Sequence, residues 1–171
     1  MARGHWVRRD RAGRLVMRFE PPEAETLVAV IADLQTVLEA GAGNDPVSRR
    51  LFPRAYLDPT EEEAEDQWQS LVQPDLLRTR LDALASVTGS LNSAPATRRG
   101  HLEIALDEAA QAQWLGVLND ARLALGTALD ITEDTELDHF DADDPRRGSF
   151  YLYSALTALQ GELIDALLSD L

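Results

Sequence analysis

The residues whose types could hold a metal ion gather in one short segment. His139 lies there among four aspartates, Asp138, Asp141, Asp143 and Asp144. Imidazole and carboxylate groups both ligate divalent cations. The spacing is not that of an EF-hand loop, because no glycine occupies the turn position and no glutamate closes the segment. The pattern favours a solvated acidic loop over a metal site, and no motif in the chain predicts a cofactor.

Four arginines near the N-terminus, Arg8, Arg9, Arg11 and Arg14, could bind phosphate groups or an acidic partner. The first 18 residues hold six arginines and one acid, Asp10, whereas the whole chain has a net charge of −14 and no lysine. Such an acidic body excludes DNA binding by the whole surface. These four arginines are therefore the predicted nucleic-acid or partner-binding residues. The alternative is a structural hairpin whose arginines are solvated.

The histidine and cysteine content argues against an enzyme. Only three histidines occur, His5, His101 and His139, and none lies in a recognisable triad context. A GxSxG motif, a P-loop and a GxGxxG motif after a strand are all missing from the sequence. The chain has no cysteine, which removes thiolate ligands, cysteine nucleophiles and disulfides. We predict a non-enzymatic protein, with a small uncharacterised enzyme as an alternative.

Three segments with alternating apolar residues predict a small antiparallel sheet. Residues 5–9 and 14–20 form a predicted hairpin around a turn at 10–13, where Gly13 can adopt a positive φ. Residues 101–106 form the third predicted strand. Because an isolated hairpin is only marginally stable, we expect all three strands to pair beneath a helix.

Residues 111–132 carry the longest helical pattern and predict the central core helix, because their apolar side chains recur at three- and four-residue steps. Gly116 and Gly126 each lower helix propensity by about 1 kcal/mol relative to alanine, which predicts the close approach of another backbone. Asp107 is expected to cap this helix. A last helix, beginning at Pro145, completes the core pair.

Three polar residues, Asn119, Asp120 and Arg122, interrupt the apolar pattern of the central helix. We expect them to point outward, or one of them to pair with an acidic residue on a neighbouring helix. A recognition role is the alternative.

Residues 21–100 are expected to hold several helices and one long loop. A first helix covers about 21–40, and a short helix follows Asp45, which can cap it. Residues 89–100 are rich in serine, glycine, asparagine and proline and form the predicted loop.

Another helix of this region is predicted to begin at Thr60, which fits a capping box with Glu63. Trp68, Leu71 and Val72 form its apolar side. Pro74 is expected to interrupt it and to restart a helix that ends near position 88.

Two parts of the chain share the order strand, acid, helix. Residues 14–34 match residues 101–121 at a constant offset, which aligns Leu15 with Leu102 and Glu20 with Asp107. The match is either a repeated unit or a coincidence of simple patterns.

These elements predict one mainly α-helical domain of the α+β class over residues 1–171. Residues 1–20 form a basic β-hairpin, 21–100 the helices and loop, and 101–171 a strand and two core helices. No apolar run approaches the ~20 residues of a membrane span, and no signal peptide is recognisable. We therefore expect a cytoplasmic protein.

Four segments resemble one protein family in the same order. The most specific is LNDARLALGTALDIT (118–132), supported by RFEPPEAETL (18–27), DPVSRRLFPRAYLD (45–58) and YLYSALTALQ (151–160). The chain is thereby similar to an uncharacterised actinobacterial domain family of the oxidative-stress regulator AosR type. Its members are encoded beside ClpS and are described as transcriptional regulators.

The resemblance implies a regulator that contacts a sigma factor or RNA polymerase. Redox sensing by paired cysteines, described for some members, is excluded here because the chain has no cysteine. A strongly acidic body would be steered toward basic protein surfaces, with auxiliary DNA contact through the hairpin. A homodimer is compatible with the sequence. The alternative function is an adaptor linked to ClpS-dependent proteolysis.

Overall fold

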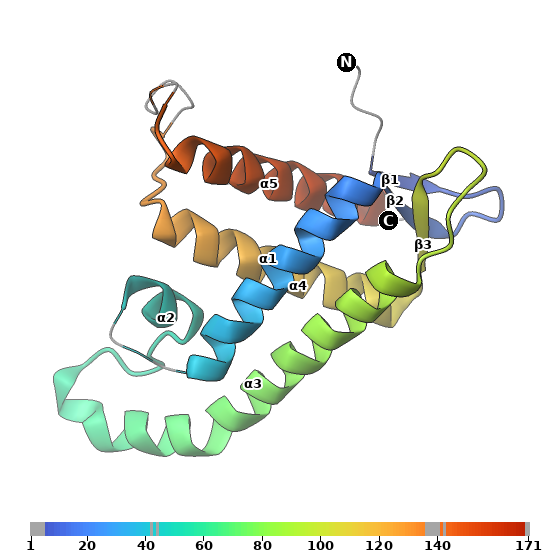
Figure 1. Cartoon of the computed structure of the whole chain (residues 1–171). Coiled ribbons are helices and arrows are strands. Elements are labelled where there is room, and N and C mark those ends of the chain that lie inside the picture. The colour runs from blue at the N-terminus through green and yellow to red at the C-terminus, as the bar shows by residue number, and fades with distance from the viewer. Residues whose placement is uncertain (1–5, 42, 44, 136–140, 142, 170–171) are drawn as a thin grey trace.

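The architecture is known from a computed structural model, which describes residues 6–41, 43, 45–135, 141 and 143–169. A three-stranded antiparallel sheet lies at one end of an assembly of helices, so the predicted mainly helical α+β class is confirmed (Figure 1). The elements are β1 (Val7–Arg9), β2 (Leu15–Phe19), α1 (Pro21–Ala40), α2 (Pro46–Leu51), a 3-10 turn η1 (Pro59–Glu61), α3 (Glu62–Ser93), β3 (Leu102–Leu106), α4 (Glu108–Ala128) and α5 (Arg146–Leu168).

Helix α4 is the centre of the fold, as its apolar pattern predicts. It contacts α1, α2, α3, α5 and β3, so it has more partners than the expected core pair. Asp107 caps it by accepting a hydrogen bond from the backbone N–H of Ala110 at 2.8 Å. Trp114 is 1% exposed and stacks on Phe19 of β2, with ring centroids 5.7 Å apart. This stacking anchors the helix to the sheet.

The two glycines of α4 differ in their surroundings. A Cβ atom on Gly126 would lie 2.9 Å from the ring of Tyr153, so this glycine admits the close approach of α5. The approaching group is a side chain and not a backbone. Nothing lies within 4 Å of the equivalent position on Gly116, so the predicted close approach there is wrong.

The sheet has the strand order β1-β2-β3, with β2 in the middle. Leu15 pairs with Leu106, and Met17 pairs with Ile104. These side chains are buried because the strands place alternate residues against the helices. The expected three-stranded antiparallel sheet is therefore confirmed, with strands that begin a little later than predicted.

The structure repeats the strand–acid–helix pattern in detail. Glu20 and Asp107 occupy the position before α1 and α4. Asp107 accepts from Ala110 N–H, whereas Glu20 N–H donates to the Glu23 carboxylate at 2.8 Å. An isolated bridge between Ala96 and Leu102 takes the place that the pair Arg9–Leu15 takes in the first hairpin.

The turns of the two hairpins also correspond. Gly13 has φ 81° and Gly100 has φ 83°, both in the left-handed region that favours glycine. Asp10 N–H donates to the Arg14 carbonyl at 2.9 Å, and Thr97 N–H donates to the His101 carbonyl at 2.7 Å. The agreement in register and turn supports a repeated unit over a coincidence.

Helix α3 corrects three predictions. It is one helix of 32 residues that passes through Pro74, and Figure 1 shows that the first part of α3 runs in a different direction from the rest. The carbonyl of Ser70, which loses its N–H partner to this proline, belongs to an exposed residue and can bind water. The predicted capping box of Thr60 and Glu63 does not form, because Asp58 instead accepts from Thr60 N–H at 2.9 Å and starts η1.

The end of α3 is the third correction. The helix continues to Ser93, so the connection to β3 is shorter than the predicted loop at 89–100. Gly89 is exposed and does not stop the helix, whereas Pro95 follows its end, where a proline disfavours further helix. No helix among the described residues has the length and apolar character needed to cross a membrane.

Candidate interaction surfaces

Three of the four predicted binding arginines make contacts within the protein. Arg8 pairs with Glu103 of β3 at 2.6 Å. Arg14 pairs with Asp10 at 2.7 Å across the turn. Arg9 donates to the carbonyls of Gly13 and Ala166, at 2.7 Å and 2.9 Å, and so ties the hairpin to the end of α5. These contacts give the three arginines a structural role in holding the hairpin.

Arg11 differs from its neighbours. It lies exposed in the turn between β1 and β2, and it has no ion-pair or side-chain hydrogen-bond partner among the described residues. The structure thus does not gather the four arginines into one site. Contact with DNA or a partner remains a prediction, for which Arg11 is the residue with a free guanidinium.

The predicted metal cluster lies mostly beyond what the structure describes. Asp138 and His139 fall outside the described residues. Asp144 accepts a hydrogen bond from Arg146 N–H at 2.8 Å and pairs with its guanidinium, which holds the pKa of Asp144 below its usual value. Within the described ranges no three histidine, aspartate or glutamate side chains come together as a metal site would require.

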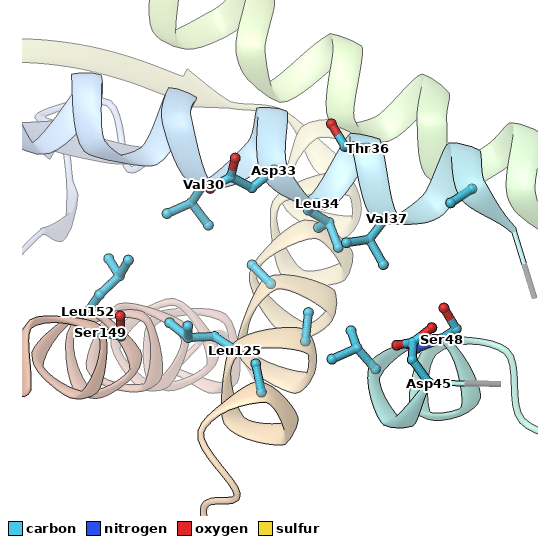
Figure 2. A pocket seen from close by; sticks show the side chains of 15 residues that line it. Val30, Asp33, Leu34, Thr36, Val37, Asp45, Ser48, Leu125, Ser149 and Leu152 are labelled. Atoms are coloured by element: carbon cyan, nitrogen blue, oxygen red, sulfur yellow. The ribbon is translucent and has the colours of Figure 1, made fainter. Parts of the chain in front are cut away.

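An apolar groove of about 560 Å³ lies between four helices. Figure 2 shows Val30, Leu34 and Val37 of α1 on one side, with Leu125 of α4 and Leu152 of α5 across from them. The few polar groups in its lining include the α2 cap, where Asp45 accepts from Ser48 N–H at 3.0 Å. Hydrogen bonding by the Ser48 side chain, together with that of the Ser48 backbone, lowers the pKa of Asp45 and occupies its carboxylate in local structure.

Asp120 of α4 does not point outward as expected, and its partner on the neighbouring helix is a base and not an acid. Asp120 is buried and pairs with Arg80 of α3, with the Arg80 Nε 3.2 Å from the carboxylate. Arg80 also donates to the carbonyl of Leu51 at 2.7 Å and lies over the Phe52 ring. Burial raises the pKa of Asp120, and the Arg80 charge opposes that shift. This cluster joins α2, α3 and α4, and sequence spacing gave no sign of it.

The first part of α3, residues 62–80, forms a surface that we call the α3 arm. All its residues are described, and none of its apolar side chains is buried. Leu71 is 75% exposed and Leu76 is 47% exposed, and Val72, which is next to Leu71 in sequence, lies one helical turn before Leu76. The predicted apolar side of this helix therefore exists, and Leu71 and Val72 on it are exposed, whereas Trp68 is partly buried. Clustered exposed apolar residues mark interaction sites more often than scattered ones do.

Acidic residues surround the apolar stripe of the α3 arm. Glu61, Glu62, Glu63 and Asp66 precede it, and Asp75 lies within it. Arg54 and Arg78 pair with Glu62 and Asp75, at 3.0 Å and 2.8 Å, which leaves the arm with excess negative charge. The complementary partner surface would be apolar with basic residues around it.

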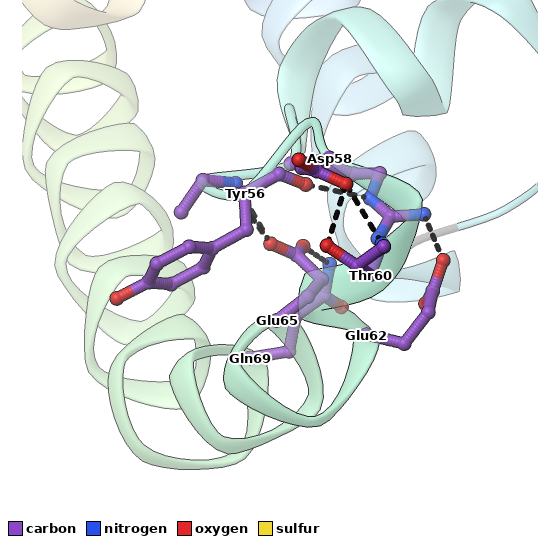
Figure 3. Close-up of polar contacts among 8 residues, drawn as sticks. Tyr56, Asp58, Thr60, Glu62, Glu65 and Gln69 are labelled. Atoms are coloured by element: carbon purple, nitrogen blue, oxygen red, sulfur yellow. Dashed lines mark hydrogen bonds and ion pairs between the residues drawn. The ribbon is translucent and has the colours of Figure 1, made fainter.

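Glu65 fixes the loop that leads into the α3 arm. It is 3% exposed, and its carboxylate accepts hydrogen bonds from the backbone N–H groups of Ala55 and Tyr56, both at 2.9 Å (Figure 3). Gln69 donates to the other carboxylate oxygen at 2.6 Å. In the sequence Glu65 belongs to a run of acidic residues of the kind that is usually exposed to solvent, so the sequence alone does not distinguish it from its neighbours. The contact presents Leu57, 82% exposed, next to the arm.

Acidification is expected to release this loop. The backbone N–H of Tyr56, with further hydrogen bonds, lowers the pKa of Glu65. Because the pKa of Glu65 is lower in the folded protein than in the unfolded chain, where it is about 4.3, these hydrogen bonds stabilise the loop fully above that pH. The stabilisation is lost as the pH falls through the pKa of Glu65 in the folded protein. The protection of the Ala55 and Tyr56 amides, measured as their exchange rate relative to the unfolded chain at the same pH, should therefore fall in that acidic range. In the variant Glu65→Gln these two amides should exchange fast at neutral pH as well. Glu63→Gln, a matched change at an exposed site, should leave their exchange unchanged. Equal exchange in both variants would refute the role of Glu65.

Comparison with known proteins gives two findings. The family model described as "Domain of unknown function (DUF2017)" matches residues 2–167. The chain is also 31% identical, over 153 residues, to the protein of Mycobacterium leprae (strain TN) named "Putative oxidative stress regulator AosR". That alignment covers 80% of this chain and 67% of the relative. No solved structure matches the chain.

Proposed function

The chain belongs to the DUF2017 family of domains of unknown function, and on that basis we propose that it is a non-enzymatic regulator of transcription that acts through protein contacts. The name of the M. leprae relative supports a regulatory role. The proposed partner is a sigma factor or RNA polymerase, met in the cytoplasm. The observation that carries the proposal is the exposed apolar stripe of the α3 arm within its acidic surroundings.

The α3 arm has the features of one half of a protein interface. Helices often bind a partner groove through apolar residues at three- and four-residue spacing, as at Val72 and Leu76, and Leu71 widens this apolar surface beside Val72. Its negative charge favours approach to the basic surfaces of proteins that themselves bind nucleic acid. The groove in Figure 2 is lined mainly by aliphatic side chains, so this groove lacks the convergent polar groups that an enzyme's active site needs.

Binding to purified components tests the proposal. The full chain is titrated against RNA polymerase core enzyme, individual sigma factors and ClpS from the native organism. We expect saturable binding to the polymerase or to a sigma factor. The double variant Leu71→Ser/Leu76→Ser should weaken it by about tenfold or more, because buried apolar anchors dominate interface energies. Leu168→Ser removes an equally exposed leucine at the far end of α5 and should leave binding unchanged.

Each other outcome has a defined meaning. Equal binding by the arm variant and the wild type would place the contact surface elsewhere. Binding to ClpS, without binding to polymerase or sigma factors, would favour the adaptor of ClpS-dependent proteolysis. Self-association that is lost in the arm variant would show that a second copy covers the α3 arm.

Auxiliary DNA contact by the hairpin is tested separately. Replacement of Arg8, Arg9, Arg11 and Arg14 by serine should weaken promoter binding if the hairpin touches DNA. Because Arg8, Arg9 and Arg14 also hold the hairpin in place, Arg11→Ser is the cleaner variant. Arg11→Ser should reduce the slope of log affinity against log salt concentration by the amount expected for the loss of about one phosphate contact. It should leave the melting temperature of the protein unchanged. Unchanged promoter binding in both variants would contradict a DNA-facing hairpin.

A further inference from the structure

A second pocket lies on the other side of α4 from the apolar groove and differs from it in chemistry. It has a volume of about 560 Å³ and is lined by residues of α2, the end of α4 and α5. Arg50 and Arg122 both contribute to its wall, together with Thr127 and Tyr153. We call it the arginine pocket. Neither the proposed function nor the α3 arm uses it.

The two arginines lack partners within the described part of the chain. Arg50 and Arg122 form no ion pair there, although the sequence contains 30 acidic residues. The Nε atom of Arg122 is buried and has no hydrogen-bond partner among these residues. A buried N–H group of a charged side chain without an acceptor is costly, and such groups in native structures are rare. Because the Nε atom has no accessible surface of its own, an acceptor from outside the chain would bind Arg122 through the other guanidinium nitrogens, which are not among these buried atoms.

The nearby acceptor groups of the protein, which could bind the arginines in place of a ligand, either accept other hydrogen bonds or form no ion pair with the arginines. The last carbonyls of α4 would attract a cation, but Leu125, Gly126 and Thr127 accept from the backbone N–H groups of Leu129, Ile131 and Asp130. Asp130 lines the pocket yet forms no ion pair with either arginine among the described residues. The negative charge of the whole protein acts weakly here, because charges beyond about 8 Å are largely screened at physiological salt.

We propose that the arginine pocket binds a small anionic ligand through a phosphate or carboxylate group held by Arg122 and Arg50. Guanidinium groups bind these planar or tetrahedral anions through paired, charge-assisted hydrogen bonds. The ring of Tyr153, which packs on Gly126, supplies an apolar wall for the rest of the ligand. The protein would then carry a ligand site separate from its partner surface.

Nuclear magnetic resonance titration of the full chain with inorganic phosphate, and separately with sodium acetate, tests this site. The arginine Nε–H signal of Arg122, assigned by its loss in Arg122→Met, should shift and saturate with at least one anion. Saturation by phosphate alone indicates a phosphoryl ligand, and saturation by acetate alone a carboxylate. The affinities of the variants are read from the backbone amide signals of Gly126 and Thr127, which line the pocket. Arg122→Met should lower the affinity by about tenfold or more, while Arg98→Met, the same change at an exposed loop arginine, should not.

Stability measurements separate loss of binding from loss of folding. Arg122→Met should melt at the same temperature as the wild type or higher, because it removes a buried donor that has no acceptor. Arg50→Met changes an exposed residue and should weaken binding without moving the melting temperature. The proposal is overturned if neither anion saturates the Arg122 signal at concentrations on the order of tens of millimolar. It is also overturned if Arg98→Met weakens binding as much as Arg122→Met does.

Discussion

Replacing Trp114 with alanine should destabilise the protein by about 3–5 kcal/mol, the cost of truncating a large buried aromatic side chain. Trp114 is 1% exposed, stacks on Phe19 and lies on the helix that every other helix contacts. The cavity would therefore open where sheet and helices meet. A domain of this size is stable by about 5–15 kcal/mol, so the variant should lose a large share of its stability. Urea denaturation followed by circular dichroism measures the change.

Trp68→Ala is the matched control for this experiment. Trp68 lies on the α3 arm and is only partly buried, so its loss should cost about 1 kcal/mol or less. Similar losses in the two variants would mean that α4 is not the centre of the fold. Trp114→Phe keeps the ring stacking and should recover most of the lost stability.

Replacing Arg80 with methionine should destabilise the protein by about 2–4 kcal/mol, because it leaves the Asp120 carboxylate buried without its cation. The side chains of Arg80 and Asp120 are 31% and 12% exposed, so the pair is shielded from solvent but not sealed. The variant also leaves the Leu51 carbonyl without its donor and frees α2 from α3. Arg78→Met is the control, since the Arg78–Asp75 pair is exposed and should contribute less than about 1 kcal/mol.

The pH dependence of the Arg80→Met defect identifies its cause. Burial raises the pKa of Asp120, and removal of the Arg80 charge removes the main effect that opposes this shift. A carboxyl group with a raised folded pKa destabilises the fold when ionised, so the defect should shrink as pH falls and the group takes up a proton. The double variant Arg80→Met/Asp120→Leu should recover most of the stability at neutral pH. A defect that is independent of pH and persists in the double variant would assign the loss to packing.

Periodicity and capping predicted most of the fold. The central helix, the cap at Asp107 and the three strands follow from patterns within short stretches of sequence, where local geometry decides the outcome. The passage of α3 through Pro74 did not follow from local rules. A proline costs one backbone hydrogen bond, and that loss is small where the orphaned carbonyl reaches water and the later helix packs through Leu84, Val87 and Leu91.

The candidate sites were less predictable than the fold, for a physical reason. The Arg80–Asp120 pair and the arginine pocket join residues from helices far apart in the sequence, and charge spacing along one helix does not report such contacts. Glu65 could not be told from the other acids in its run. The apolar side of the α3 arm was visible in the sequence, but its exposure depends on which neighbours the folded chain provides.

The symmetry of the β2–β3 pairing bears on how such a fold could arise. Met17 and Ile104 occupy equivalent positions in the two hairpin–helix units, and they are also paired with each other. Interchanging the two units turns the pair Leu15–Leu106 into the pair Leu102–Phe19, which lies on the other side of Met17 and Ile104. This is the geometry of an isologous dimer interface whose two-fold axis passes between Met17 and Ile104. Strands β2 and β3 thus resemble the subunit boundary of an ancestral homodimer whose gene was duplicated and fused. Fusion would have freed the halves to diverge, so that α1 leads into α2 and the long α3, while α4 leads into α5.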